Sequence, residues 1–282
     1  MSVLSVSLSC AENKPSAVTN TIVRGVANLP LEQRRAFLRG TLSDWRINTD
    51  MKRGVKPPPV QKPCSEKADF ISLVPPDKFE IGNLSVRKAI KNRRSRRVFS
   101  TESFSLEELS YLLWSTQGVS GVERDEDGNI TAQYRTVPSG GGRHPFETYL
   151  VINRVQSVKP GLYRYLPMEH KLMVIMESPD FAGRIMASCY GQECVGTAAV
   201  VFVWTTIPYR TEWKYGGIAS KMIAVEAGHV CQNLYLAAES VKGAVCAVMG
   251  YDQKRMDNLL HIDGKDEFVI YLAVTGKPVE EN

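Results

Sequence analysis

The run Ala198-Ala199-Val200-Val201-Phe202-Val203-Trp204 decides the fold of this chain of 282 residues. Every position in it is apolar, and a strand without hydrophobic–polar alternation is typical of a strand covered on both faces. Residues 221–241 follow, with apolar residues on several faces of a helical pattern. Such a pattern predicts a long, buried helix. We therefore expect a sheet with helices packed against it.

Weaker patterns on either side predict the remaining elements of this domain. Further strands are expected at residues 149–152, 162–166, 244–248 and 268–274. Ser105 and Glu108 have the spacing of a capping box ahead of an apolar stripe, which predicts the start of a helix. Ser178 and Pro179 suit the N-cap and first turn of another helix, which Gly191 would end. Because strands and helices alternate irregularly, the pattern favours an α+β fold over repeated βαβ units.

The N-terminal part of the chain has a different character. We expect an N-terminal arm at residues 1–83, partly extended and rich in proline, ahead of a domain at residues 84–282. A helix is predicted at residues 31–45. The prolines that follow favour extended backbone and exclude a regular helix; they are Pro57, Pro58, Pro59, Pro63, Pro75 and Pro76. Residues 118–132 are polar and acidic, which predicts a surface loop.

The composition limits the class of protein. The hydrophobic fraction of 43% supports a sizeable core, and a formal net charge of +5 argues only weakly for anionic partners. Six cysteines form no Cys-x-x-Cys pair, and the four histidines lack ligand spacing, so neither a disulfide framework nor a metal site is expected. No apolar run reaches the length of a membrane span. We therefore expect a cytoplasmic protein without a membrane partner.

Two polar stretches have the composition of ligand-binding loops. In Arg93-Arg94-Ser95-Arg96-Arg97, guanidinium groups and a hydroxyl are suited to bind phosphate oxygens. The same run could be a solvated basic patch or a nucleic-acid signal. In Pro138-Ser139-Gly140-Gly141-Gly142, glycines allow the backbone to approach a flat or anionic ligand. A flexible turn is the alternative.

Three further stretches complete the set. Lys214-Tyr215 could form a proton donor–acceptor pair, or be a surface lysine beside a packed tyrosine. Glu226-Ala227-Gly228-His229 lies in the predicted buried helix, where a histidine is more often a hydrogen-bonded core residue than a catalyst, and where Gly228 is expected to mark a close contact. In Met249-Gly250-Tyr251-Asp252, backbone amides could donate to a ligand and Asp252 could cap the next helix.

The order of these motifs along the chain resembles the nitroreductase family. It runs from an Arg-x-Ser-x-Arg segment after a helix, through a Pro-Ser-Gly loop before a strand and a Glu-Ala-Gly-His-x-x-Gln-Asn helix, to a Gly-Tyr-Asp turn. The resemblance covers about residues 84–277. It is closest to the SagB-type dehydrogenase branch, which includes azoline dehydrogenases of peptide natural-product pathways.

The resemblance implies a central, mostly antiparallel sheet flanked by helices, and FMN held at a homodimer interface. It assigns cofactor binding to Arg93, Arg94, Ser95, Arg97, Pro138, Ser139, Gly140, Gln192, Met249 and Gly250. Lys214 and Tyr215 match a pair that azoline dehydrogenases use for proton abstraction. Lys277 is the nearby candidate for a further phosphate contact.

The resemblance leaves two net reactions open, both transferring hydride through flavin N5. The first is NAD(P)H-linked reduction of a small acceptor such as a nitroaromatic or a quinone. The second is FMN-dependent dehydrogenation of a thiazoline or oxazoline ring in a modified peptide. A non-catalytic nucleic-acid-binding protein that uses the arginine run ranks last, because it gives the glycine loop no role.

Overall fold

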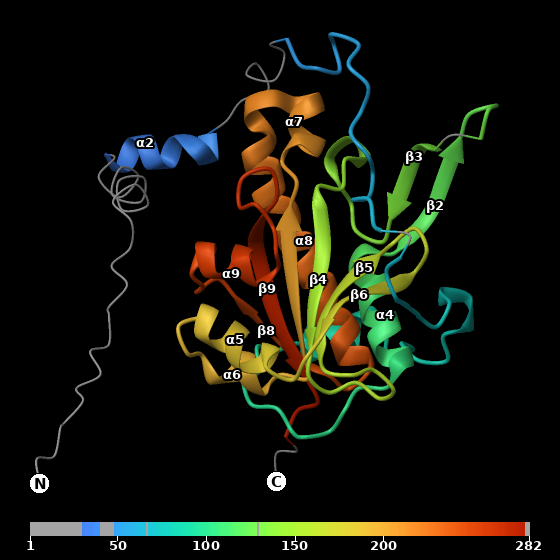
Figure 1. Cartoon of the computed structure of the whole chain (residues 1–282), viewed down its shortest axis with the longest axis vertical. Coiled ribbons are helices and arrows are strands. Elements are labelled where there is room, and N and C mark those ends of the chain that lie inside the picture. Colours follow the sequence, from blue (N-terminus) through green and yellow to red (C-terminus); the bar gives the residue numbers. More distant parts are fainter. Residues whose placement is uncertain (1–29, 40–47, 66, 129, 280–282) are drawn as a thin grey trace, which may run out of the picture. The chain divides into compact units, whose positions relative to one another are not determined.

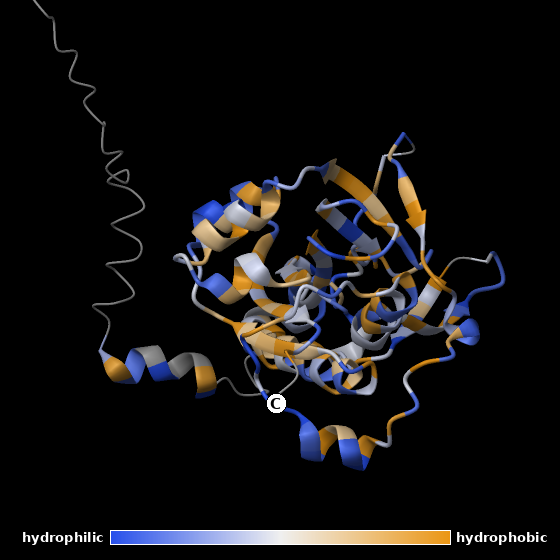
Figure 2. Ribbon diagram, turned by 90° about the horizontal axis from the view of Figure 1, so that it is seen from below, coloured by the Kyte–Doolittle hydropathy of each residue, from blue (hydrophilic) through white to orange (hydrophobic). Residues whose placement is uncertain are grey.

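The computed structural model describes residues 30–39, 48–65, 67–128 and 130–279. The chain divides into two compact units, residues 1–41 and 42–282. In the first, helix α2 (Leu31–Ala36) runs into a 3-10 turn, Phe37–Arg39, and Figure 2 shows hydrophobic and hydrophilic residues interspersed along it. The helix predicted at residues 31–45 is thus found in its first part. The remainder lies outside the described residues.

The second unit is built on a seven-stranded sheet (Figure 1). Its strands are β1 (Phe70–Ser72), β4 (Phe146–Ile152), β5 (Gly161–Leu166), β6 (Lys171–Glu177), β7 (Val200–Thr206), β8 (Ala244–Val248) and β9 (Phe268–Gly276). They lie in the order β1-β6-β5-β4-β7-β9-β8, and every pair is antiparallel. The apolar run at residues 198–204 supplies most of the interior strand β7, whose residues are all buried.

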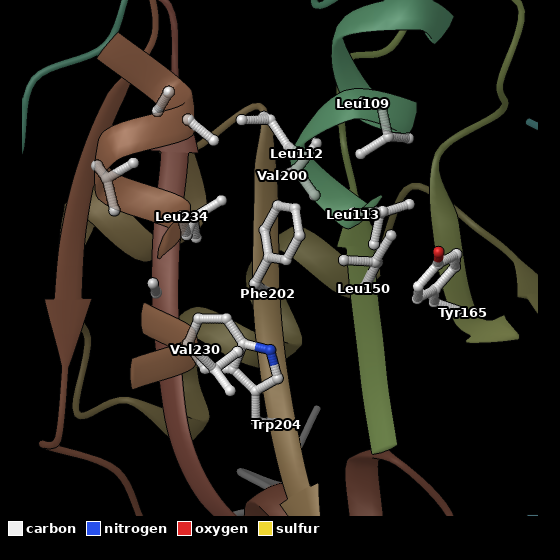
Figure 3. Packing of buried hydrophobic residues seen from close by; sticks show 14 of the residues in the cluster. Leu109, Leu112, Leu113, Leu150, Tyr165, Val200, Phe202, Trp204, Val230 and Leu234 are labelled. Carbon is white, nitrogen blue, oxygen red and sulfur yellow. The ribbon is translucent and has the colours of Figure 1, made fainter. Parts of the chain in front are cut away.

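Helices cover both faces of the sheet. They are α3 (Val86–Asn92), α4 (Leu106–Gln117), α5 (Phe181–Ser188), α6 (Glu193–Thr197), α7 (Tyr209–Tyr215), α8 (Ala219–Ser240) and α9 (Gln253–Leu259). Helices α4 and α8 pack on the face that carries Phe202 and Trp204, as Figure 3 shows. Helices α5, α6 and α9 pack on the opposite face, with Val201 and Val203. This arrangement confirms the predicted α+β architecture.

Local signals account for several helix ends. Ser105 and Glu108 form the predicted capping box, with each side chain accepting from the other's backbone N–H. Asp252 accepts from the backbone N–H of Arg255 at 2.8 Å and caps α9 as expected. The prediction for α5 was wrong: the helix begins at Phe181, and Ser178 lies three residues ahead of that start.

Residues 118–132 do not form a loop. Strands β2 (Val119–Arg124) and β3 (Ile130–Arg135) pair as an antiparallel hairpin that projects from the main sheet (Figure 1). Polar and acidic composition favoured a loop, but a hairpin whose two strands are largely exposed needs few apolar residues. The acidic residues lie around its tip.

The proline-rich segment at residues 57–63 is extended and held by buried arginines. Their guanidinium groups donate to its backbone carbonyls: Arg210 to Pro59, Arg135 to Val60, and Arg164 to Lys62 and Pro63. Glu147 balances part of this charge, because its Oε1 accepts from Arg210 at 2.6 Å and from the Lys62 N–H at 2.9 Å. The segment then continues to β1 at the edge of the sheet.

We expect Glu147→Gln to lower the free energy of unfolding by about 3 kcal/mol, because it leaves the buried Arg210 without its ion-pair partner. Both side chains of this pair are 2% exposed. The matched control is Glu177→Gln, whose partner Lys159 is 75% exposed, and which should cost less than about 1 kcal/mol. Urea denaturation of both variants measures the difference. Equal losses would contradict the role given to Glu147.

Candidate functional site

The glycine loop at residues 138–142 is held against α8 by one carboxylate. Glu226 Oε2 accepts from the Ser139 hydroxyl and Oε1 accepts from the Gly140 N–H, both at 2.8 Å. Ser139 Oγ in turn accepts from the backbone N–H of His144 at 2.9 Å. Glu226 is 6% exposed, and burial raises the pKa of its carboxyl group. A loop made mostly of glycine thereby acquires a fixed path.

Lys214 and Tyr215, at the end of α7, converge on this loop. A Cβ built on Gly141 would lie 2.5 Å from the Tyr215 hydroxyl oxygen and 2.7 Å from Lys214 Nζ. Gly141 also has a φ of 61°, a left-handed conformation that side chains disfavour. Burial and the nearby charge of Glu226 raise the pKa of Tyr215, which keeps the phenol neutral. The structure therefore brings the predicted proton pair and the glycine loop together.

The arginine run lies near the C-terminal end of α8 and is fastened to β8. Ser95 forms a parallel bridge with Val245, and the Arg96 N–H donates to the Val245 carbonyl at 3.0 Å. Ser95 Oγ is 2.9 Å from the Tyr235 hydroxyl. The Arg93 guanidinium lies over the Tyr235 ring, 5.4 Å from its centre. Tyr235 thus contacts two members of the run.

The four arginines are not equivalent. Arg96 pairs with Glu239 at 3.1 Å, which removes it from the groups that can bind a ligand. Arg94, Ser95 and Arg97 are exposed. The run therefore presents guanidinium groups and a hydroxyl from a packed part of the domain, as a phosphate site requires.

The remaining predicted cofactor residues lie beside the arginine run. Gln192 donates through Nε2 to the Gly250 carbonyl at 2.8 Å. Met249 is 68% exposed, and within the described chain neither its N–H nor that of Gly250 donates to another backbone group. Burial raises the pKa of the Cys194 thiol, and the charge of Arg97 opposes this, which places Arg97 next to α6. Outward amides and arginines thus occupy one region.

The predicted site residues form two groups rather than one. The first contains Pro138, Ser139, Gly140, Lys214 and Tyr215, around Glu226. The second contains Arg93, Arg94, Ser95, Arg97, Gln192, Met249 and Gly250, near Tyr235. Glu226 and Tyr235 are nine positions apart on α8, about 14 Å along the helix axis.

Two expectations for this region were wrong. His229 is exposed rather than buried in the core, and an added Cβ on Gly228 would meet no atom within 4 Å. Both lie on the outward face of α8 together with Val225, which is 55% exposed. Periodicity marked this face as buried because its residues are small or apolar.

Lys277 is held by other groups of the domain and is not available to a phosphate. Its ammonium group pairs with Glu108 and donates to the Val241 carbonyl at 2.9 Å, and the residue is 8% exposed. It is therefore withdrawn as a phosphate ligand. Among the described residues, no helix is long and apolar enough to cross a membrane, and no three His, Cys, Asp or Glu side chains gather as a metal site.

Sequence reasoning gave no role to Glu226 or Tyr235. Each is a polar residue on a flank of the buried stripe of α8, at the boundary between core and surface. A polar residue beside an apolar stripe is a usable signal, because it can hold a neighbouring loop. The partner loops, however, become visible only in three dimensions.

The antiparallel sheet flanked by helices, the anchored glycine loop and the exposed arginine run define an α+β domain with two candidate ligand-binding segments. The family model described as "Nitroreductase family" matches residues 90–277. The chain belongs to the nitroreductase family, and this membership supports FMN as its cofactor.

Individual relatives agree with this assignment. The nitroreductase-type protein MJ1384 of Methanocaldococcus jannaschii is 27% identical over 201 residues, covering 71% of this chain and 95% of its own. A structure from Ralstonia eutropha JMP134 matches with a TM-score of 0.59 and 23% identity, over 80% of this chain and 99% of that one.

Two further structures share the fold. A protein from Anabaena variabilis matches with a TM-score of 0.60 and 23% identity. The match covers 78% of this chain and 45% of that protein, so this chain spans less than half of its length. A chain of the Escherichia coli microcin synthetase McbBCD complex matches with a TM-score of 0.54 and 20% identity, over 74% of this chain and 79% of that one. At these identities the likeness concerns the fold.

The residues present fit FMN on structural grounds. The exposed groups of the arginine run suit its phosphate. The N–H groups of the exposed residues Met249 and Gly250, which donate to no backbone group of the described chain, suit the polar edge of its ring. Gly140 and Gly141 let the loop pack closely against the side chains of Met222, Lys214 and Tyr215, which fixes its backbone beside the groove.

We expect Glu226→Ala to release the glycine loop, because both carboxylate contacts disappear. Hydrogen exchange followed by mass spectrometry should show faster exchange of the Gly140 amide, while Glu226→Gln, which retains an acceptor, should protect it better. Glu239→Ala is the control, since it removes another partly buried carboxylate from α8. Unchanged exchange in Glu226→Ala would contradict the anchoring role.

Proposed function

We propose that this chain is an FMN-dependent oxidoreductase in which Lys214 and Tyr215 handle the proton that accompanies hydride transfer. The observation that carries the proposal is the convergence of Lys214 Nζ and the Tyr215 hydroxyl on Gly141. A base and a neutral phenol at one point are suited to remove a proton and hold it. FMN, when bound, supplies reversible hydride transfer at N5.

The proton pair favours dehydrogenation of a thiazoline or oxazoline ring in a modified peptide. Such a reaction removes a hydride and a proton from adjacent ring carbons, so it needs a base beside the cofactor. Lys214 is the base in this proposal. Tyr215, whose pKa is raised by burial and by Glu226, stays protonated and donates a hydrogen bond to the substrate.

NAD(P)H-linked reduction of a small acceptor is the second candidate. Its support is the relation to MJ1384, which carries a nitroreductase description. In that reaction the same pair would deliver a proton to the reduced acceptor. The two candidates therefore share residues and differ in the direction of proton transfer.

Charge supports one orientation of the cofactor. The arginine run would hold the phosphate, with the Ser95 hydroxyl as an additional donor. Glu226, beneath the glycine loop, would repel a phosphate placed there. Met249 and Gly250 would direct their amides at the ring, where negative charge develops on reduction.

We expect Lys214→Ala to lower the rate of azoline oxidation about 100-fold, because a positioned base is lost, while FMN remains bound. The assay uses the FMN-loaded enzyme and a thiazoline peptide, and detects loss of two hydrogens by mass spectrometry. Lys254→Ala removes an exposed lysine from α9 and serves as the control.

The second candidate would be favoured if the wild-type enzyme binds FMN, does not oxidise azolines, and reduces quinones with NADH or NADPH. A protein that does not take up FMN would defeat both.

We also propose that the chain works as a homodimer through the outward face of α8. An apolar groove of about 450 Å³ joins this face to the glycine loop; its lining includes Pro138, Gly140, Ile218, Met222, Val225 and His229. A second copy would exclude water from the groove and bring the glycine loop of one subunit towards the arginine run of the other. FMN then need not span the separation of the two groups within one chain, where their anchors Glu226 and Tyr235 lie about 14 Å apart along α8.

We expect Val225→Glu to shift the protein to monomers and to weaken FMN binding, because a carboxylate is placed in the apolar face. Light scattering after size-exclusion chromatography measures the mass, and flavin absorbance measures the cofactor. The control is Met176→Glu, at a 44% exposed position on β6. A monomeric wild-type protein with full FMN content would rule out the dimer.

A further inference from the structure

We infer that Tyr235 is a positioning residue that fixes the direction of the hydrogen bond at Ser95, so that the Ser95 hydroxyl donates its own proton to the flavin phosphate. The inference deepens the proposed function and rests on its assignment of the arginine run to FMN. It concerns one hydroxyl on α8 that no motif singled out.

The Tyr235 oxygen has two neighbours within hydrogen-bond distance. It accepts from the Ala247 N–H at 2.8 Å, so β8 holds the phenol in place. Its other contact is Ser95 Oγ at 2.9 Å, where the distance alone allows either hydroxyl to donate. The phenol has one proton to give.

The need to pair the phenol proton determines which hydroxyl donates in the contact between Tyr235 and Ser95. If Ser95 donated to Tyr235, the phenol proton would find no acceptor among the hydrogen bonds of the described residues. If Tyr235 donates to Ser95, the phenol proton is paired, and the one proton left over is that of Ser95, an exposed residue. A partly buried donor left without a partner costs free energy, so the second arrangement is favoured.

The consequence lies at Ser95. Its oxygen already accepts from Tyr235, and its proton is left to donate outward. Ser95 is exposed and lies between Arg94 and Arg97 along the run, also exposed. A hydroxyl in this setting donates to an anion, and polarisation through the preceding bonds strengthens that donation.

The Tyr235 ring has a separate role. The Arg93 guanidinium lies 5.4 Å from its centre, within the range of a cation–π contact. The ring and the hydroxyl therefore position two different members of the run. Substitution by phenylalanine separates these roles, because it removes the hydroxyl and keeps the ring.

The experiment compares two flavins on Tyr235→Phe. Apoprotein is titrated with FMN and with riboflavin, which lacks the phosphate, and flavin fluorescence reports binding. We expect FMN binding to weaken about fivefold, as for loss of one neutral hydrogen bond, because the bond that orients Ser95 is lost while the Ser95 hydroxyl remains; riboflavin binding should be unchanged. Tyr235→Leu, which also loses the ring, should weaken FMN binding further.

Controls identify the origin of any change. Tyr163→Phe removes a tyrosine hydroxyl on β5, which donates to the Lys159 carbonyl, and should leave the preference for FMN over riboflavin intact. In a Ser95→Ala background, Tyr235→Phe should have no further effect on that preference. Circular dichroism confirms that each variant is folded.

The outcomes separate the inference from the proposal beneath it. If Arg97→Ala and Ser95→Ala lower the preference for FMN but Tyr235→Phe does not, the inference is wrong and the phosphate site stands. Equal weakening of both flavins by Tyr235→Phe would also overturn it, since the role would be structural. If none of these variants alters the preference, the phosphate lies elsewhere and the site assignment fails.

Discussion

The packing of α8 on the sheet is the constraint on which the candidate site depends. Its buried stripe, which includes Ala227, Cys231, Leu234 and Ala238, fixes the rotation of the helix about its axis. At about 100° per residue, that rotation places Glu226 on one flank of the stripe and Tyr235 on the other. The same apolar contacts that stabilise the domain therefore determine where the two polar residues point.

Each flank residue holds a segment with little regular structure of its own. Glu226 fixes the glycine loop through a hydroxyl and an amide, and Tyr235 fixes the arginine run through Ser95 and Arg93. Hydrogen bonds to a helix that is already ordered offset part of the entropy cost of ordering these segments. Functional groups on loops thus gain the precision of the core beneath them.

Much of this fold was predictable because its strongest signals are local. The apolar run of β7, the capping box at Ser105 and the cap at Asp252 each act within a few residues, and the structure confirms all three. The β2–β3 hairpin was missed although its pairing is local, because the polar and acidic composition of its strands and turn masked it. The start of α5 was misplaced because a suitable Ser-Pro pair lies just ahead of it.

The sequence singled out the candidate segments but not their division into two groups. Motif order selected the arginine run and the glycine loop, and did not reveal that they lie at opposite ends of one helix or that Arg96 pairs with Glu239. Nor could periodicity separate a face buried in the core from a face buried against another molecule, since both select the same residue types.

That ambiguity on α8 bears directly on chemistry. The outward face continues into the groove beside the glycine loop, so a second subunit that covered Val225 would also limit how much water reaches Gly140 and Glu226. Water weakens the electrostatic interactions that Glu226, Lys214 and Tyr215 make with their surroundings. Covering the groove would strengthen each of these interactions without moving a single residue of the loop. In the proposed dimer, the association state and the proton chemistry at Lys214 and Tyr215 would therefore be linked through one helix face.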